Sequence, residues 1–255
     1  LCTAGPEHLL ITELAPLGSL DAFLEGHEAE VTIEHKMTML QQICGGMAAL
    51  AEAVLVHRDL ASRNILVFAF DAASPASTVV KITDFGLAID RHYQTHATVQ
   101  GDEVPFRWMP PEALRRRRFS EKSDVWAFGV TAWELLTGGD IPYSNLQDSQ
   151  IQAHVCGSNR LPRPNGCPDE LWTLLQRTWA EQPAARPTPR GCPPWWRPGW
   201  RQYAGVPGWG WGPNGRRRWE RRREKGSPGK KPFFGMARAR VSRGGARSGP
   251  GGGRR

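Results

Sequence analysis

The sequence predicts an α+β fold that is mainly α-helical, with a short strand region at the N-terminus and a separate C-terminal tail. Between Ile33 and Ala53, apolar residues recur every three or four positions, which is the period of a helix with one buried face. The run from Ser123 to Leu136 is apolar on nearly all sides, as in a helix at the centre of a core. Residues 1–187 carry a net charge of −8 and residues 188–255 a net charge of +16. The total of +8 is therefore the sum of an acidic domain and a basic tail.

The first elements follow from local signals. Leu9–Leu14 is an apolar run that ends at a proline and a glycine, and we expect a strand leading into a connector that ends near residue 18. Ser19 is a good helix N-cap, and Asp21 lies in the first turn, where the helix dipole favours a negative charge. The helical period of the next segment continues through Met47–Val56.

Two motifs then identify the domain. Residues 57–64, His-Arg-Asp-Leu-Ala-Ser-Arg-Asn, fit the pattern H-R-D-L-x-x-x-N, and residues 84–86, Asp-Phe-Gly, follow at the expected distance. In both respects the sequence resembles the protein kinases. The resemblance implies a protein-kinase-like fold, with residues 1–18 as the end of the small lobe and the hinge. Residues 19–188 would form the large lobe, with a catalytic loop at 57–64 and an activation segment at 84–112.

The resemblance also implies roles for three residues. Asp59 would orient the acceptor hydroxyl and accept its proton, while Asn64 and Asp84 would bind Mg²⁺ on the phosphates of ATP. Phosphoryl transfer needs these residue types because its catalysis depends mainly on positioning and charge neutralisation. Taken singly, each residue has an ordinary structural alternative: a turn residue, a strand cap or a surface acid.

The residues around Asp59 favour tyrosine as the acceptor. In the kinases, Ala-x-Arg-Asn after the catalytic Asp is typical of tyrosine kinases, and this chain has Ala61, Arg63 and Asn64 in that order. Arg63 would assist catalysis near the phosphates, although it could equally be a solvated charge. Residues 104–109, Val-Pro-Phe-Arg-Trp-Met, resemble the tyrosine-kinase segment that receives the residue after the acceptor. We therefore expect a protein substrate that bears tyrosine.

The same resemblance assigns ATP contacts. Glu13 and Ala15 would bind adenine through backbone groups of the hinge, Thr12 would be the gatekeeper, and Leu66 would also contact the nucleotide, beside Asn64 and Asp84. Any buried strand before a turn looks like a hinge, so this assignment depends on the spacing to residues 57–64. Between the strand-like runs 65–70 and 79–83, residues 71–78 form a longer connection than the family usually has.

Regulatory roles are implied for four residues. Tyr93 is the only tyrosine of residues 84–112 and the candidate autophosphorylation site, where a phosphate could pair with Arg58. Glu112 would pair with Arg186 inside the large lobe. Pro110 stands where the family has Ala, and removes a backbone donor there. Arg115–Arg118 could attract acidic substrates or phosphate, but a solvated charged face is the simpler interpretation.

Composition and cysteine content indicate the cellular compartment in which the chain functions. No run of 18 apolar residues exists, and no signal peptide precedes the domain, so we expect no membrane span in this chain and a cytoplasmic catalytic portion. Five scattered cysteines without a C-x-x-C pair favour free thiols in a reducing compartment. The chain opens on Leu1, and its 255 residues contain neither a glycine loop upstream of residue 57 nor the phosphate-binding Lys. We expect these residues alone to transfer phosphate hardly at all.

The last 67 residues, 189–255, are rich in Pro, Gly, Arg and Trp, and we expect them to be disordered because they cannot bury enough apolar area. Their basic runs could bind nucleic acid or an acidic membrane, or the segment could be a translated intron or a frame error. Two functions therefore stay open at this point. One is a tyrosine kinase, and the other is a non-catalytic module, either pseudokinase-like or a basic chain that binds nucleic acid.

Overall fold

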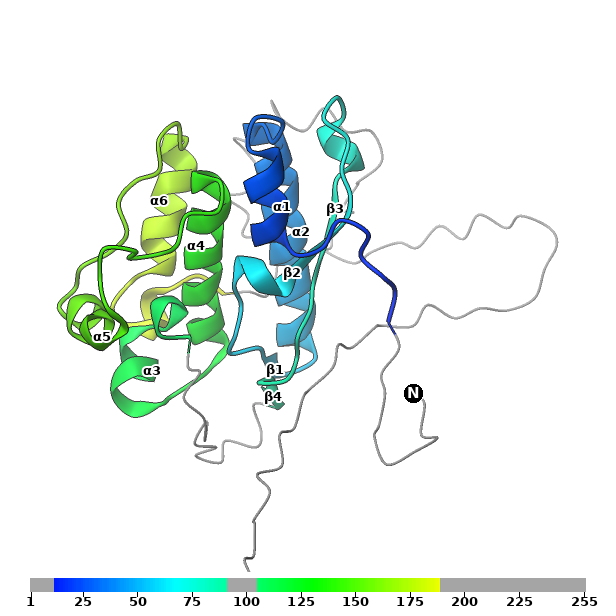
Figure 1. The fold of residues 1–255 in the computed structure, drawn as a ribbon. Coiled ribbons are helices and arrows are strands. Elements are labelled where there is room, and N and C mark those ends of the chain that lie inside the picture. Colours follow the sequence, from blue (N-terminus) through cyan, green and yellow to red (C-terminus); the bar gives the residue numbers. More distant parts are fainter. Residues whose placement is uncertain (1–11, 91–104, 189–255) are drawn as a thin grey trace, which may run out of the picture.

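The computed structural model describes residues 12–90 and 105–188. Tyr93, Val104 and the expected tail lie outside these residues. The described part contains six α-helices: α1 (Leu20–His27), α2 (Ile33–Glu52), α3 (Pro111–Arg116), α4 (Glu121–Thr137), α5 (Asp148–Cys156) and α6 (Asp169–Thr178) (Figure 1). It also contains two antiparallel strand pairs, β1 (Leu55–Val56) with β4 (Ile89–Asp90) and β2 (Ile65–Ala69) with β3 (Val79–Ile82).

Helix α4 is the centre of the core, as its composition predicted. It packs against α2 and α6, and every residue from Ser123 to Leu136 is buried. Ser120 caps its N-terminus in a reciprocal arrangement with Ser123, which satisfies two backbone donors. Gly138 follows its last turn with φ +85°, a left-handed conformation that favours glycine at a helix C-terminus.

Helices α1 and α2 follow their predicted positions with two corrections. Ser19 occupies the N-cap position of α1, but its side chain makes no capping hydrogen bond; the residue instead forms a β-bridge with Leu66. The apolar period does not continue as helix to Val56, because Val54 adopts φ +63° and the chain turns into strand β1. The apolar stripe of α2 is buried as expected at Met37, Leu40, Ile43 and Met47, with Leu50 partly buried.

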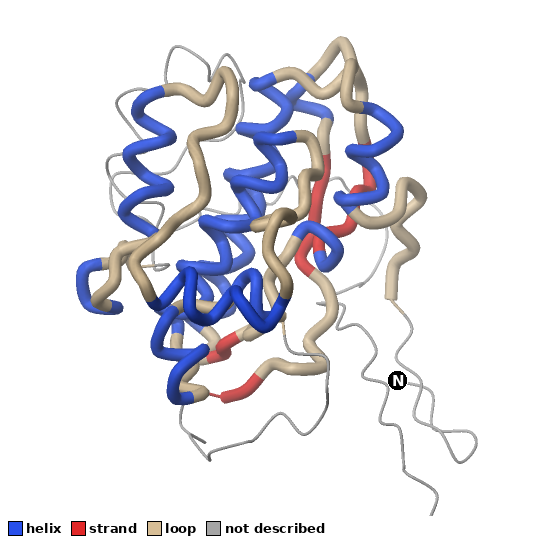
Figure 2. Tube along the Cα trace, turned by 60° about the vertical axis from the view of Figure 1, so that its left-hand side comes forward, coloured by secondary structure: helices blue, strands red, loops and turns tan. Residues whose placement is uncertain are grey.

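The β2–β3 hairpin carries the polar loop at one end. Ile65 pairs with Ile82 and Val67 with Val80, while residues 71–78 connect the strands through a short 3₁₀ turn. Figure 2 shows the two strand pairs as separate short red segments in a mainly helical domain. In consequence, residue 64 just before β2 and residue 83 just after β3 lie beside each other.

The structure differs from the sequence predictions at one expected strand and at two helices that were not predicted. Of the expected strand 9–14 the structure describes only residues 12–14, and these belong to no strand. Helix α3 was not predicted, because it has six residues and directly follows Pro110. Helix α5 was not predicted either, because most of its residues are polar and only Ile151 and Val155 are buried.

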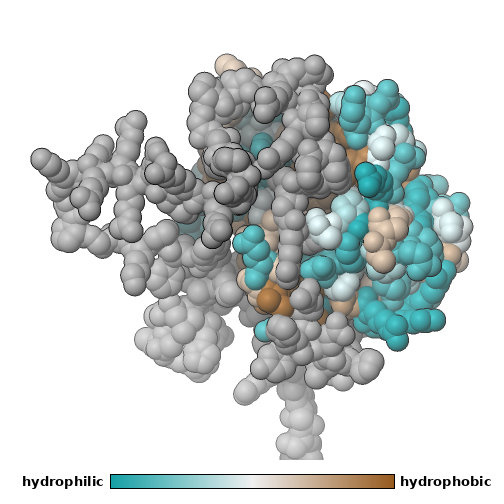
Figure 3. All heavy atoms as spheres, turned by 180° about the vertical axis from the view of Figure 1, so that it is seen from behind, coloured by the Kyte–Doolittle hydropathy of each residue, from teal (hydrophilic) through white to brown (hydrophobic). Residues whose placement is uncertain are grey.

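On the face in Figure 3, the residues not drawn in grey are mostly hydrophilic, with isolated hydrophobic residues between them. Among the described helices, none has the length and apolar character needed to cross a bilayer. All four arginines of the run 115–118 are exposed, as expected for a solvated charged face.

Candidate active site

The 57–64 loop is held from beneath by Asp124 of α4. The backbone N–H groups of His57 and Arg58 donate to its two carboxylate oxygens, at 2.7 and 3.0 Å. Burial raises the pKa of Asp124 to about 7, although the two hydrogen bonds favour the charged form and oppose that shift. Arg58 has φ +69°, a costly conformation for a residue with a side chain, and these bonds help to maintain it.

His57 connects the loop to the end of the hairpin. Its Nε2 lies 3.0 Å from the carbonyl oxygen of Thr83, and its Nδ1 lies 3.3 Å from the backbone nitrogen of Asp59. Burial lowers its pKa, so the neutral imidazole is favoured, with Nε2 donating and Nδ1 accepting. Its ring also contacts that of Phe85, with 5.3 Å between centroids. A buried neutral histidine here is a structural link between the two motifs.

The Asp59 carboxylate receives two side chains from its own loop. Asn64 Nδ2 donates to Asp59 Oδ2 at 2.8 Å and to the Asp59 carbonyl at 2.7 Å, while Arg63 forms an ion pair with Oδ1. The Asp59 side chain retains 16% exposure, so solvent or a substrate can reach it. The Asn64 amide nitrogen donates both of its hydrogen bonds to Asp59. Its Oδ1 is therefore the atom that could coordinate a bound cation.

Asp84 directly follows Thr83, whose backbone forms a hydrogen bond with Asn64. The Thr83 N–H donates to the Asn64 carbonyl at 2.9 Å, so the hairpin places Asp84 next to the 57–64 loop. Asp84 has φ +57°, and its Oδ1 accepts the Gly86 N–H at 3.1 Å, so that within the described residues its Oδ2 remains available to a ligand. Within residues 12–90 and 105–188, no three His, Cys, Asp or Glu side chains are grouped as a metal site. One amide and one carboxylate oxygen suit a magnesium ion that takes its other ligands from phosphates and water.

The expected hinge residues run along the hairpin. The Leu17 N–H donates to the Val67 carbonyl, and the Val67 N–H donates to the Gly18 carbonyl at 2.9 Å, which places this connector beside Leu66. The Ala15 carbonyl also accepts the Gly18 N–H, at 3.4 Å. The exposed Glu13 carboxylate forms an ion pair with Lys81 of β3. The structure thus brings Ala15 and Leu66 to one edge of the hairpin.

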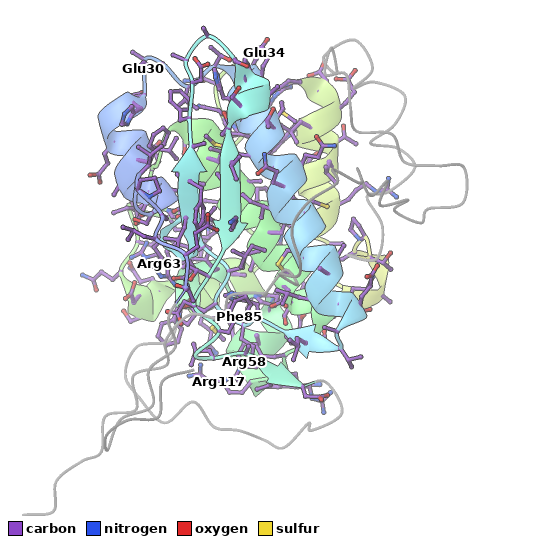
Figure 4. All side chains as sticks on the ribbon, turned by 90° about the vertical axis from the view of Figure 1, so that its right-hand side faces the viewer. Glu30, Glu34, Arg58, Arg63, Phe85 and Arg117 are labelled. Carbon is purple, nitrogen blue, oxygen red and sulfur yellow. The ribbon has the colours of Figure 1, made fainter. Side chains whose placement is uncertain are left out.

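Arg58 lies close to the start of the 84–112 segment. Its Nε donates to the Leu87 carbonyl at 2.6 Å, and its guanidinium lies 5.2 Å from the centre of the Phe119 ring. Figure 4 shows Arg58, Arg63 and Phe85 in the half of the domain opposite Glu30 and Glu34. The expected phosphate acceptor, Tyr93, lies outside the described residues.

Glu112 and Arg186 form the expected pair. Arg186 donates from both terminal nitrogens to the two Glu112 oxygens, at 2.6 and 2.8 Å, and its side chain has no exposed surface. It also donates to the carbonyls of Lys122, Ala180 and Glu181. Because loss of either partner would leave a buried charge, such a pair costs about 3–5 kcal/mol to break from one side. It fixes the start of α3 against the end of the described chain.

Three contacts near Asp59 were not predicted from the sequence. Glu134 of α4 is buried and accepts hydrogen bonds from Ser62 and Trp108, and the Trp108 ring lies under Arg63. One signal in the sequence could have found Glu134: it is a charged residue inside an otherwise apolar helix, and a buried charge requires partners. Nothing in the sequence indicates which partners, because Ser62 lies 72 positions away.

Comparisons with known proteins agree with the motifs. The family model for protein tyrosine and serine/threonine kinases matches residues 1–192. Ephrin type-A receptor 8 of Rattus norvegicus is 40% identical over 187 residues, which cover 72% of this chain and 48% of the receptor. The transforming protein ros of UR2 avian sarcoma virus, a tyrosine-protein kinase, is 40% identical over 195 residues, 74% of this chain and 48% of ros. Inactive tyrosine-protein kinase 7 of Gallus gallus is 37% identical over 197 residues, 74% of this chain and 18% of that protein. The chain therefore spans less than half the length of each of these relatives.

Proposed function

Because the chain belongs to the protein tyrosine and serine/threonine kinase family, we propose that it is the large lobe of a protein-tyrosine kinase, which transfers the γ-phosphate of ATP to a tyrosine hydroxyl. The observation that carries the proposal is the Asp59 carboxylate, held by Asn64 and Arg63 in a loop that Asp124 fixes from beneath. The motifs and the name of the similar protein ros, a tyrosine-protein kinase, support tyrosine as the acceptor.

In this proposal, Asp59 accepts a hydrogen bond from the tyrosine hydroxyl and directs its oxygen toward the γ-phosphorus. As the new oxygen–phosphorus bond forms and the bond from the γ-phosphorus to ADP breaks, Asp59 receives the hydroxyl proton. Arg63 orients the carboxylate and adds a positive charge near the transferred group, where negative charge is spread over the phosphoryl oxygens. The Arg63 guanidinium is itself placed by the Trp108 ring, 4.5 Å away.

Asn64 Oδ1 and the free oxygen of Asp84 would bind magnesium, while Ala15, Glu13 and Leu66 would contact the adenine. A bound Mg²⁺ would supply positive charge that neutralises the phosphates. The chain itself holds these two oxygen ligands near each other. The hydrogen bond from the Thr83 N–H to the Asn64 carbonyl joins the two ends of the hairpin that carry them. Tyr93 and Arg58 are proposed as the phosphorylated residue and its partner.

A second candidate function is a non-catalytic kinase-like module, and one observation favours it: a relative with 37% identity is named as inactive. Against it stands the presence of Asp59, Asn64 and Asp84 together, since a scaffold has no chemical need for all three. The two candidates differ in whether loss of Asp59 changes phosphate transfer.

The experiment measures phosphorylation of a poly-Glu-Tyr peptide by the 255-residue chain and by any longer natural form of the protein. We expect a longer form that carries a glycine loop and its lysine to transfer phosphate, and Asp59→Asn to lower kcat by about a thousandfold. We expect the 255 residues alone to transfer it hardly at all. Asp71→Asn, an exposed acid in the hairpin connection, is the matched control. Phosphate transfer that Asp59→Asn leaves intact would contradict the proposed role.

A cytoplasmic location is part of the same proposal, because ATP is the phosphate donor. It is supported by Cys156 and Cys167, which form no disulfide. The proposed partners are ATP and a protein substrate with an accessible tyrosine.

A further inference from the structure

Glu134 is a buried carboxylate that accepts three hydrogen bonds. The residue is 5% exposed, and its Oε1 accepts the Ser62 hydroxyl at 2.6 Å. Its Oε2 accepts the Ser62 N–H at 3.2 Å and the Trp108 indole N–H at 2.8 Å. Burial raises the pKa of Glu134, and these hydrogen bonds oppose that rise. The carboxylate thus joins the 57–64 loop to the segment 105–109.

Trp108 continues the connection on its other side. The Arg63 guanidinium lies 4.5 Å from the centre of the indole ring, and the same guanidinium pairs with the Asp59 carboxylate. Ser62 and Arg63 are neighbours in sequence. The contacts therefore form a closed circuit, Ser62–Glu134–Trp108–Arg63–Asp59, that begins and ends in one loop.

A second set of contacts fixes the backbone beside Trp108 independently. The Arg107 guanidinium donates to the carbonyls of Pro142, Tyr143 and Leu146 and to the Asp148 carboxylate, at 2.7–3.0 Å. With that backbone held, the remaining freedom of Trp108 is the orientation of its ring. The hydrogen bond from the indole N–H to Glu134 restrains this orientation.

We propose that Ser62 and Glu134 are positioning residues for phosphoryl transfer: they fix the Trp108 ring, which places Arg63, which in turn orients the Asp59 carboxylate. The inference rests on the proposed function, in which Asp59 directs the acceptor hydroxyl. It extends that function by assigning a role to the variable position of Ala-x-Arg-Asn, where this chain has a hydroxyl. It also connects the catalytic residue to the segment proposed to receive the substrate residue after the tyrosine.

Three variants open the circuit at different points. Ser62→Ala removes one hydroxyl donor and leaves the backbone N–H of the loop. Trp108→Phe removes the indole N–H and keeps an aromatic face for Arg63. Glu134→Gln keeps the volume of the side chain and removes its charge and one acceptor. Thr178→Val is the matched control, because it removes a buried hydroxyl on α6 whose hydrogen bond is to the Leu175 carbonyl, outside the circuit.

The first measurement is steady-state kinetics in a form of the protein that phosphorylates peptide. Ser62→Ala and Trp108→Phe are each expected to lower kcat about tenfold, because a small displacement of a catalytic group is costly. The KM for ATP should stay within about twofold of the parent value. The kcat of the double variant, Ser62→Ala with Trp108→Phe, should be no lower than that of the slower single variant, because both substitutions open the same circuit. Thr178→Val should keep the parent kcat. A parental kcat in Ser62→Ala, or fully additive losses, would overturn the proposal.

The second measurement needs no phosphate transfer. In the NMR spectrum of the 255-residue chain, the Trp108 indole N–H and the Arg63 guanidinium protons are expected to shift in Ser62→Ala and Glu134→Gln, and to stay in place in Thr178→Val. Unmoved Arg63 signals in both circuit variants would refute the coupling. If the signals move as expected but no form of the protein transfers phosphate, the proposed function fails and the contact circuit stands.

Discussion

At the residue scale, Asp124 combines two opposing demands. Its carboxylate lies in the core, where a charge is poorly solvated, yet it accepts two backbone donors that favour the charge. Burial is the larger effect, and it raises the pKa to about 7. The native state therefore binds a proton more tightly than the unfolded chain, whose Asp has a pKa of about 3.9.

The sign of the resulting pH dependence follows directly. A raised native pKa stabilises the fold fully below the unfolded value, and this contribution is lost as the pH rises from about 4 to about 7. Asp124→Asn cannot titrate and keeps a single acceptor, so we expect it to be less stable, by a margin that shrinks with rising pH. The slope of the difference should reach at most about 1.4 kcal/mol per pH unit. Urea unfolding of both proteins between pH 5 and 8 measures it, and a margin independent of pH would contradict the assignment.

At this scale, sequence reasoning selects residues whose types and spacing fit a known motif. Asp59, Asn64 and Asp84 could be selected because their types and order match a known pattern, and the structure brings Asn64 onto Asp59 and Asp84 next to Asn64. The contacts of Glu134 with Ser62 and Trp108 could not be predicted, because they depend on how α4 packs behind the loop. Packing of this kind is a property of the folded chain, and hydrophobic period alone does not specify it.

At the element scale, the contact between α4 and α6 depends on a missing side chain. A Cβ added at Gly129 would lie 2.0 Å from Thr178 Oγ1 and 2.6 Å from Trp179 Nε1. Both neighbours are buried, so neither can move away easily. By contrast, a Cβ added at Gly45 of α2 would meet no heavy atom within 4 Å.

The two glycines therefore predict opposite results for one substitution. Alanine is about 1 kcal/mol better than glycine in a helix interior, so Gly45→Ala should stabilise the domain by up to that amount. Gly129→Ala should destabilise it by about 1–3 kcal/mol, because overpacking outweighs the same gain in propensity. Urea unfolding of both variants at one pH tests this pair. Stabilisation by Gly129→Ala would show that α6 can move away without cost.

Helix boundaries show what the sequence could predict about elements. The long apolar helices α2 and α4 were predicted to within a few residues, since a buried stripe over many turns is a strong signal. Helices α3 and α5 are short and contribute few buried residues, so tertiary contacts decide their conformation. Arg107, for example, binds the carbonyls that lead into α5 and so fixes where that helix begins.

At the scale of the whole molecule, the chain divides by charge near residue 188. The described domain ends where Lys122 donates to the carbonyls of Arg186 and Pro187, and where Arg186 pairs with Glu112. These contacts tie the end of the domain to α3 and α4. We propose that residues 189–255, which carry the whole net charge of +16, add nothing to the stability of residues 1–188.

Deletion of residues 189–255 tests this division. The net charge changes from +8 to −8. The free energy of unfolding should change by less than about 0.5 kcal/mol, because the contacts of Lys122 with residues 186 and 187 and the pair Glu112–Arg186 are kept. Any binding of the full chain to a DNA oligonucleotide should weaken steeply with salt and be abolished by the deletion, because phosphate contacts release counterions. Fluorescence anisotropy across a salt series measures the binding, and urea unfolding measures the stability. A loss of several kcal/mol would place part of the segment inside the fold, and equal DNA binding by the shortened chain would instead implicate Arg115–Arg118, the exposed basic run of the domain itself.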